Sequence, residues 1–334
     1  MSRQRIKQEI PKISERDLRI FRKLNAAGWL TTLQICNYFF PGRSLNAVSK
    51  RLRKLSAAKY IAIARVGSTQ QALYRLAGQG KLALIEHSGL DEQDITIPNQ
   101  LPRKVRHFTA INDLRFYFEQ LSGSPNAELL FFFSERELYS YYQGTHTGSD
   151  VLIQLLRSYK IVPDAIARIR ITKEGIVREV DLAIEYDSGT EHAAFFGRTK
   201  IKGYASLFAQ NHERLEDFKV LTFTESIKRI ISLMRQTIRY QPPHHLFYFA
   251  TIEQLSPIGW EAEKIFLDPY DFFIPIRRAD QIEVIEKEIT GAGAAIPKEA
   301  LVNLPATSPR RGSLREERER AYNYPEYTSL DANQ

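Results

Sequence analysis

Apolar residues recur at helical spacing three times near the start of the chain. The first stripe follows Ser14 and two acidic residues, which predicts a capped helix that ends near 26–28. Thr31 or Thr32 opens a second amphipathic helix, and the Pro-Gly pair at 41–42 stops it. This first part of the chain is therefore predicted to be helical.

A third helix opens at Ser44 and has two distinct faces. The runs 60–66 and 72–76 are rich in strand-forming residues, and the loop 67–71 joins them into a hairpin. Three helices followed by a hairpin predict a winged helix over residues 12–85. The apolar face of the third helix is expected to pack on the core through Leu45, Val48, Leu52 and Leu55.

The other face of the third helix is polar and basic. Asn46, Lys50 and Arg53 share it, which suits insertion into a major groove beside phosphates. Together with flanking residues and the hairpin, the candidate DNA contacts are Asn46, Lys50, Arg51, Arg53, Lys54 and Arg65.

Positive charge is concentrated at the same end of the chain. Of the 47 Lys and Arg, 17 lie in residues 1–82, which hold only three of the 39 acidic residues and so carry +14. The remaining 30 basic and 36 acidic residues carry −6. This asymmetry predicts double-stranded DNA as the partner of the first domain. The alternatives are a solvated basic face without a ligand and a winged helix that binds only protein.

Composition excludes several other classes. With 43% hydrophobic and 26% charged residues, the 334-residue chain has ordinary globular usage and room for about two domains. Cys36 is the only cysteine, so no disulfide framework or Cys-based zinc site is possible, and a cytoplasmic location is expected. Apolar runs such as 129–133 are far shorter than the roughly 20 residues of a membrane span, so no membrane partner is expected.

A second domain is predicted over 103–285, after a polar linker at 86–102. The fold class is therefore α/β (α+β overall), with a mixed sheet in the second domain and a disordered tail at 290–334, where apolar residues are scarce. The expected elements are a helix at 105–121, strands at 129–134, 161–171 and 178–187, a helix at 193–210, a strand at 219–224, a helix at 225–237 and a strand at 244–251.

Acidic residues converge on one face of the strand 178–187. Alternation places Asp181, Glu185 and Asp187 opposite the apolar face, and a neighbouring strand can bring Asp164 beside Glu185. Carboxylates at the edge of a sheet are suited to Mg²⁺ or Mn²⁺, so the candidate metal ligands are Asp164, Glu185 and Asp187.

The helix that follows supplies a cation. Lys200 lies on the apolar stripe that also contains Phe196, Tyr204 and Leu207, whereas Lys202 is turned about 200° away and should be solvated. A lysine that faces the sheet beside carboxylates can orient an attacking water or stabilise the charge that develops on a phosphate.

These residues resemble a known nuclease core. Asp164, Glu185, Asp187 and Lys200 are similar to the PD-(D/E)xK motif of the restriction-endonuclease-like fold, except that the usual lysine position holds Asp187 and the lysine has moved to the next helix. The segment IEYDSGTEHAAFFGRTKIKGY and the N-terminal pattern resemble the replication-relaxation family, which includes the C-type plasmid mobilisation relaxases.

The resemblance covers about residues 14–270 and has functional implications. It adds His107, Asp113 and Glu135 to the candidate catalytic residues Asp164, Glu185, Asp187 and Lys200. It implies a relaxase-like, metal-dependent DNA-nicking endonuclease that acts in plasmid replication or mobilisation, with other proteins of these processes as partners.

Each assignment has an alternative. Asp187 could begin an exposed turn, His107 could be a packed core histidine, and Lys200 could extend from a packed stem without touching a metal. The second domain could also be a catalytically inactive platform for docking or for a homodimer. Tyr139, Tyr141 and Tyr142 resemble a cluster of nucleophiles but are expected to pack as an aromatic strand.

Overall fold

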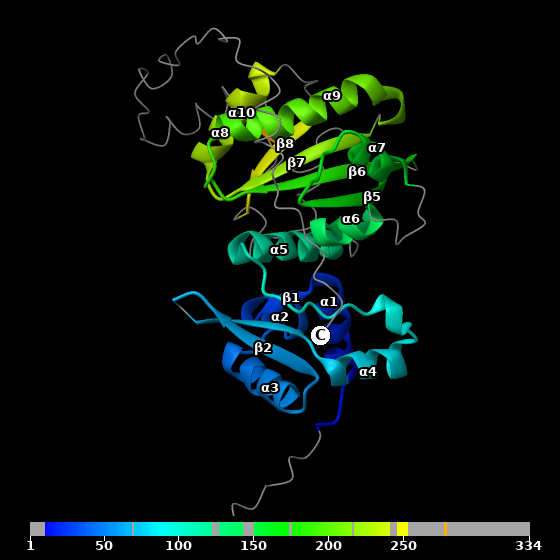
Figure 1. Cartoon of the computed structure of the whole chain (residues 1–334), viewed down its shortest axis with the longest axis vertical. Helices are drawn as coiled ribbons and strands as arrows, with labels where there is room; N and C mark the ends of the chain where they lie inside the picture. Colours follow the sequence, from blue (N-terminus) through cyan, green and yellow to red (C-terminus); the bar gives the residue numbers. More distant parts are fainter. Residues whose placement is uncertain are drawn as a thin grey trace, which may run out of the picture.

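The described part of the chain is built around two separate sheets (Figure 1). A computed structural model describes residues 11–68, 70–121, 127–142, 150–173, 176–215, 217–240, 246–252 and 277–278. The first sheet has the strand order β1-β3-β2, and the second has the order β4-β5-β6-β7-β8-β9. We call the described residues of 11–100 the N-terminal module and those of 105–278 the C-terminal module. The predicted mixture of helix and sheet is confirmed.

The N-terminal module follows the predicted order of helices and hairpin. Ser14 and Thr31 form capping boxes, and Ser44 caps the third helix, as their sequence positions indicated. The strand β1 was not predicted; it pairs with β3 of the hairpin. The elements are α1 (Glu15–Ala27), β1 (Trp29–Thr31), α2 (Thr32–Phe39), α3 (Leu45–Ala57), β2 (Ile61–Val66), β3 (Gln71–Leu76) and α4 (Gly78–Ser88).

Three of the four residues on the predicted apolar face of helix α3 pack on the core. Val48, Leu52 and Leu55 are fully buried, whereas Leu45 is 48% exposed. The prediction for Leu45 was wrong because this residue begins the helix, and the buried cluster extends along α3 only from Val48 onward.

The segment predicted as a linker, 86–102, packs on the N-terminal module. Helix α4 continues to Ser88, and Ile95 is buried in the first core. Asn25 fixes the chain on both sides of Ile95, since its Nδ2 donates to the carbonyl of Asp94 (3.0 Å) and its Oδ1 accepts from the amide of Thr96 (2.9 Å). This part of the chain is therefore not a free tether.

The C-terminal module is a mixed sheet with helices on both faces. Strands β4, β5 and β6 are antiparallel, β6, β7 and β8 are parallel, and β9 returns antiparallel to β8. The elements are α5 (Val105–Leu121), β4 (Ala127–Ser134), α6 (Glu135–Tyr142), α7 (Val151–Ser158), β5 (Ala165–Lys173), β6 (Ile176–Asp187), α8 (Ala193–Phe196), a π-helical turn (Gly197–Ile201), α9 (Lys202–Asn211), β7 (Phe218–Thr224), α10 (Ile227–Arg239), β8 (Phe247–Thr251) and β9 (Arg277–Arg278).

A separate apolar core fills each face of this sheet. Helices α7, α8, α9 and α10 pack on one face, and α5 packs on the other, where it lies between the sheet and the N-terminal module (Figure 1). Helix α5 thus contacts both the second sheet and the N-terminal module.

Two sequence expectations in this region were wrong. The tyrosines at 139, 141 and 142 lie on the helix α6, not on a strand, because Leu138 is buried and Tyr141 and Tyr142 pack on the same core at helical spacing. The strand expected from 161 begins at Ala165, after the unpredicted helix α7. The predicted tail at 290–334 lies outside the described residues, and no helix that the structure describes is long and apolar enough to cross a membrane.

Candidate active site

The candidate site lies where β5 begins and β6 ends. The register of these antiparallel strands places Ala165 opposite Ile184, so Asp164 comes beside Glu185, as the sequence predicted. The backbone amide of Tyr186 donates to Asp164 Oδ2 (2.8 Å), and the amide of Glu135 donates to the Asp164 carbonyl (2.8 Å). Two other chain segments, the end of β6 and the start of α6, therefore fix Asp164.

Glu185 is a buried carboxylate with two specific donors. It is 1% exposed, and Lys200 Nζ lies 2.9 Å from each of its oxygens. Tyr204 OH donates to Oε1 (2.6 Å), and Lys200 Nζ also donates to the carbonyl of Val162 (2.7 Å). The predicted orientation of the helix is thus observed, with Lys200 toward the sheet and Lys202 exposed.

A local irregularity of the helix presents Lys200. The turn Gly197–Ile201 is π-helical, a feature that is frequent at functional sites. Gly197 faces α10 so closely that an added Cβ would lie 2.9 Å from Tyr240 Cε2. Glycine at this position therefore lets the turn pack against α10 while Lys200 points to Glu185.

His107, on the first turns of α5, joins the same site. Its Nε2 lies 3.1 Å from Asp164 Oδ1, and its ring packs edge-on against Tyr186 with centroids 5.4 Å apart. His107 is therefore both packed and paired with a candidate metal ligand.

Asp187 points to a partner that the sequence did not reveal. It is 8% exposed and forms an ion pair with Arg229 of α10, whose Nε and Nη2 lie 2.9 and 2.7 Å from Oδ2. Its Oδ1 also accepts from the amide of Gly189 (2.7 Å), so the residue begins a turn, but a buried one. Only the general rule that carboxylates in a sheet seek cations could have suggested Arg229.

The segment of the chain that contains these residues matches a known protein family. Residues 21–220 match the family described as replication-relaxation. The chain belongs to the replication-relaxation family. The match includes Asp164, Glu185 and Lys200, and it associates the chain with plasmid replication or mobilisation. No curated protein matches the chain.

The two central carboxylates of this replication-relaxation protein have different pKa values. Burial raises the pKa of Glu185 to about 7, and Asp164 adds to the effect, although Lys200 and Tyr204 oppose it. Burial also disfavours ionisation of Asp164, but His107 and Lys200 outweigh it and lower the pKa of Asp164. Asp164 is in turn the main reason that the pKa of His107 is raised despite burial. Such divergence is typical of sites with acid–base or metal chemistry.

Glu135 lies close to this group. Burial raises the pKa of its carboxyl, and the negative charge of Asp164 raises it further, against Lys200 and His107. Its helix, α6, begins at Glu135 directly after β4. The structure thus brings Asp164, Glu185, Lys200, His107 and Glu135 together.

Asp113 does not lie with these residues. Its Oδ1 accepts from Gln34 Nε2 of α2 (2.9 Å), and the neighbouring Asn112 donates from Nδ2 to the carbonyl of Trp29 (2.8 Å). Both side chains therefore face the N-terminal module. Asp113 lies six positions after His107, so on a helix the two side chains point about 120° apart, and His107 faces the sheet.

Replacing Asp113 by Asn should stabilise the protein above neutral pH. Burial raises the pKa of Asp113 to about 6, so the folded state loses stability as the pH rises through that value, whereas Asn keeps the bond from Gln34. The gain should be roughly 3 kcal/mol at pH 8 and should vanish below about pH 4. Urea unfolding at several pH values measures it; an equal gain at every pH would contradict this account.

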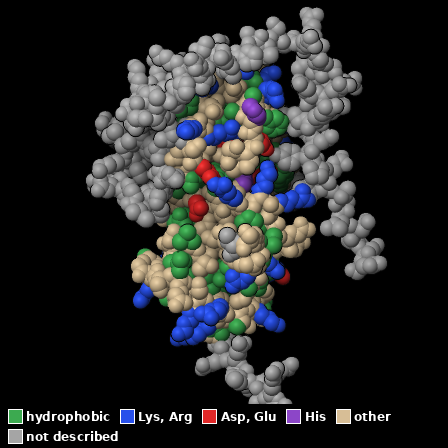
Figure 2. Space-filling view, turned by 90° about the vertical axis from the view of Figure 1, so that its left-hand side faces the viewer, with side chains coloured by type: hydrophobic (Ala, Val, Ile, Leu, Met, Phe, Trp, Pro, Cys, Tyr) green, Lys and Arg blue, Asp and Glu red, His purple; other side chains and the backbone are tan. Residues whose placement is uncertain are grey.

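The candidate DNA contacts divide into exposed and internal side chains. Asn46, Lys50, Arg53, Lys54 and Arg65 are exposed, and Lys and Arg gather at this end of the molecule (Figure 2). Arg51, in contrast, turns inward to the fully buried Asp17 of α1, with Nη2 2.5 Å from Oδ2 and Nε 3.1 Å from Oδ1. Arg51 could reach a phosphate only by leaving this pair.

The donor set partly fits a divalent cation. Among the described residues, no group of three or more His, Cys, Asp or Glu side chains is placed to hold a metal, and Asp187 is engaged by Arg229. Asp164 and Glu185 remain as adjacent carboxylates. Because Mg²⁺ is often bound by one or two carboxylates together with water and substrate phosphates, two suffice.

Proposed function

We propose that this replication-relaxation protein binds duplex DNA through its N-terminal module and nicks it at the Asp164–Glu185 site with Mg²⁺ or Mn²⁺. The observation that carries the proposal is the buried Glu185, which lies beside Asp164 and is bonded by Lys200. A buried carboxylate, a second carboxylate and a lysine on adjacent elements match the composition of a metal-dependent phosphodiesterase site.

The residues have separable roles in this proposal. Asp164 and Glu185 would hold the cation, which would lower the pKa of a bound water and polarise the phosphate. Lys200 stabilises the charge that develops on the scissile phosphate, and the carbonyl of Val162 holds its Nζ in place. His107 orients Asp164 through its bond to Oδ1, while Tyr204 holds Glu185. Asp187 and Arg229 together shape the end of β6.

The N-terminal module supplies DNA affinity in this proposal. Its element order is that of a winged helix, and the exposed face of α3 is basic. The Lys50→Ala, Arg53→Ala double variant should bind duplex DNA about tenfold more weakly at moderate salt and show a shallower salt dependence, since two phosphate contacts are lost. Fluorescence anisotropy over a salt series measures both. Unchanged binding would remove α3 from the interface.

Plasmid nicking tests the catalytic part. Purified protein is incubated with supercoiled plasmid and Mg²⁺, Mn²⁺ or EDTA, on several plasmids including one that carries the gene, while a mobility shift monitors binding. We expect conversion to open circles with Mg²⁺ or Mn²⁺ and none with EDTA. Calorimetry should show Mn²⁺ uptake by the wild type that Glu185→Ala or Asp164→Ala removes.

An inactive binding protein is the second candidate. The observation in its favour is that Lys200 and Arg229 already neutralise Glu185 and Asp187, so the acidic strand is satisfied without a metal. DNA binding without nicking or Mn²⁺ uptake would support this function and contradict the nuclease.

A further inference from the structure

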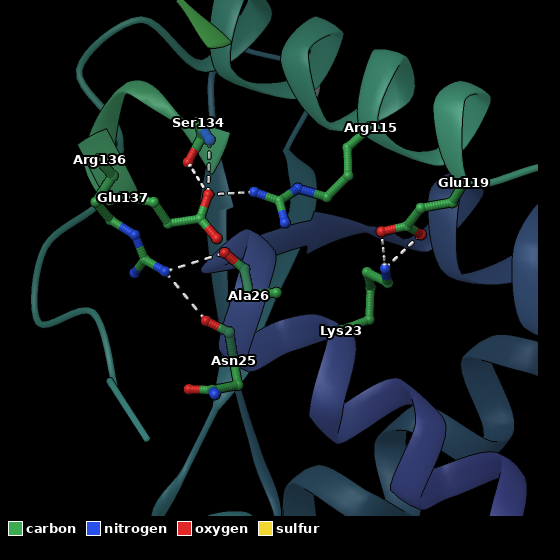
Figure 3. Close-up of polar contacts among 8 residues, drawn as sticks. All are labelled: Lys23, Asn25, Ala26, Arg115, Glu119, Ser134, Arg136 and Glu137. Atoms are coloured by element: carbon green, nitrogen blue, oxygen red, sulfur yellow. Dashed lines mark hydrogen bonds and ion pairs between the residues drawn. The ribbon is translucent and has the colours of Figure 1, made fainter. Parts of the chain in front are cut away.

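The two modules are joined by a polar contact between α1 and the helices α5 and α6 (Figure 3). Lys23 of α1 forms an ion pair with Glu119 near the end of α5. Arg136 of α6 donates from Nη2 to the carbonyls of Asn25 (3.0 Å) and Ala26 (3.1 Å), at the C-terminal end of α1. Both α1 and α5 are therefore fixed to the opposite module.

Arg136 meets a specific electrostatic need of α1. Helix α1, which is described throughout, has acidic residues in its first turn but no basic residue in its last. The partial negative charge and free carbonyls of a helix C-terminus are stabilised by a cation. Arg136 supplies that cation from the C-terminal module and adds to the cap that Gly28 makes to the carbonyl of Leu24.

The first turn of α6 connects this contact to the candidate site. Its first three residues bond in three directions: the Glu135 amide to Asp164, Arg136 to α1, and Glu137 to Arg115. Glu137 is further fixed by the amide and hydroxyl of Ser134 at 2.7 and 2.6 Å. One helical turn therefore contacts a candidate metal ligand and the N-terminal module at once.

An apolar contact reinforces the polar one. Phe116 of α5 is 3% exposed and belongs to the core of the N-terminal module, where it stacks on Tyr38 with ring centroids 3.7 Å apart. Asn112 and Asp113 add the hydrogen bonds to β1 and α2 described above. Domains joined by small polar contacts usually move relative to each other, but this interface combines a shared aromatic core with buried polar pairs.

We propose that this docking holds α3 and the Asp164–Glu185 site at one fixed separation, with Arg136 as a positioning residue. The C-terminal module then meets DNA at a constant distance from the sequence that the N-terminal module binds. The inference rests on the proposed DNA binding, but not on nicking. The interface between the modules, and not the DNA sequence, then sets where the C-terminal module contacts the DNA.

Two measurements on the full chain test the proposal. Spin labels at Asn37→Cys and Glu213→Cys, in a Cys36→Ser background, report the distance between the modules; both positions are exposed. An iron chelate on Glu191→Cys, whose carbonyl bonds Arg229 near the site, cuts nearby DNA whether or not the protein is a nuclease. Both measurements compare the parent protein with two double variants. The interface variant combines Lys23→Met with Arg136→Met, and the control variant combines Arg22→Met with Arg157→Met, which removes equal charge at exposed positions. Either single interface variant serves if the double variant does not fold.

Parent and control should give a narrow distance distribution and one cluster of cuts at a fixed offset from the footprint. The interface variant should at least double the width of the distribution and spread the cuts, with unchanged DNA affinity. A broad distribution in the parent, or sharp cuts in the interface variant, would overturn the proposal. Narrow distances without any footprint would reject the proposed DNA binding and, with it, a constant distance between two DNA contacts. The fixed separation of the modules would then stand as a property of the protein alone.

Discussion

A Lys200→Met protein should bind plasmid DNA normally and lose at least about 100-fold of its nicking rate. Lys200 Nζ is held by Glu185 and by the carbonyl of Val162, so its charge is oriented before any phosphate arrives. Methionine preserves much of the packed stem but cannot stabilise developing negative charge. Burial already raises the pKa of Glu185, and the variant also removes the Lys200 ammonium that opposes this effect. Glu185 is then less ionised and a weaker metal ligand.

Lys202→Met is the matched control. Lys202 lies two residues further along and is exposed, so the same change in charge and shape should leave nicking within about twofold of the wild type. Gel quantification of open circles over time gives both rates, and circular dichroism confirms folding. Equal rates for Lys200→Met and wild type would remove Lys200 from the chemistry. Loss in both variants would indicate a general effect of charge on DNA contact.

Local sequence patterns were sufficient to predict the centre of the candidate site. Alternation along β6 and helical spacing over Phe196, Lys200 and Tyr204 predict that Glu185 and Lys200 face each other, as observed, although the helix has a π-helical turn at Lys200. Asp164 follows from the pairing of β5 with β6.

Partners that are distant in sequence could not be predicted in this way. Arg229 reaches Asp187 from a helix 42 residues later, and the helical face of Asp113 is assigned only once the N-terminal module is docked on α5. The aromatic run at 138–142 shows a related limit, since a short apolar run fits a strand or a helix until tertiary packing decides.

Arg51 is the sharpest example of this limit, and replacing it by Met should lower the free energy of unfolding by about 3 kcal/mol at pH 7. Its position beside Lys50 predicts a phosphate contact, yet its guanidinium bonds the fully buried Asp17, 34 residues earlier, and the carbonyl of Lys12 (2.9 Å). Removing one member of such a pair leaves an uncompensated charge on the other. Lys50→Met, on the exposed face, should change stability by less than about 0.5 kcal/mol.

The pH dependence of this loss separates a buried ion pair from a packing defect. Burial opposes ionisation of Asp17, but bonds from Arg51 and Ser14 outweigh it and lower the pKa of Asp17. The pair therefore contributes stability at neutral pH that is lost as the pH falls through the pKa of Asp17 in the folded state. Urea unfolding should show the gap between wild type and Arg51→Met narrowing from pH 7 toward pH 3. A gap that is constant with pH would show that Arg51 acts through its packed stem and not through the ion pair with Asp17.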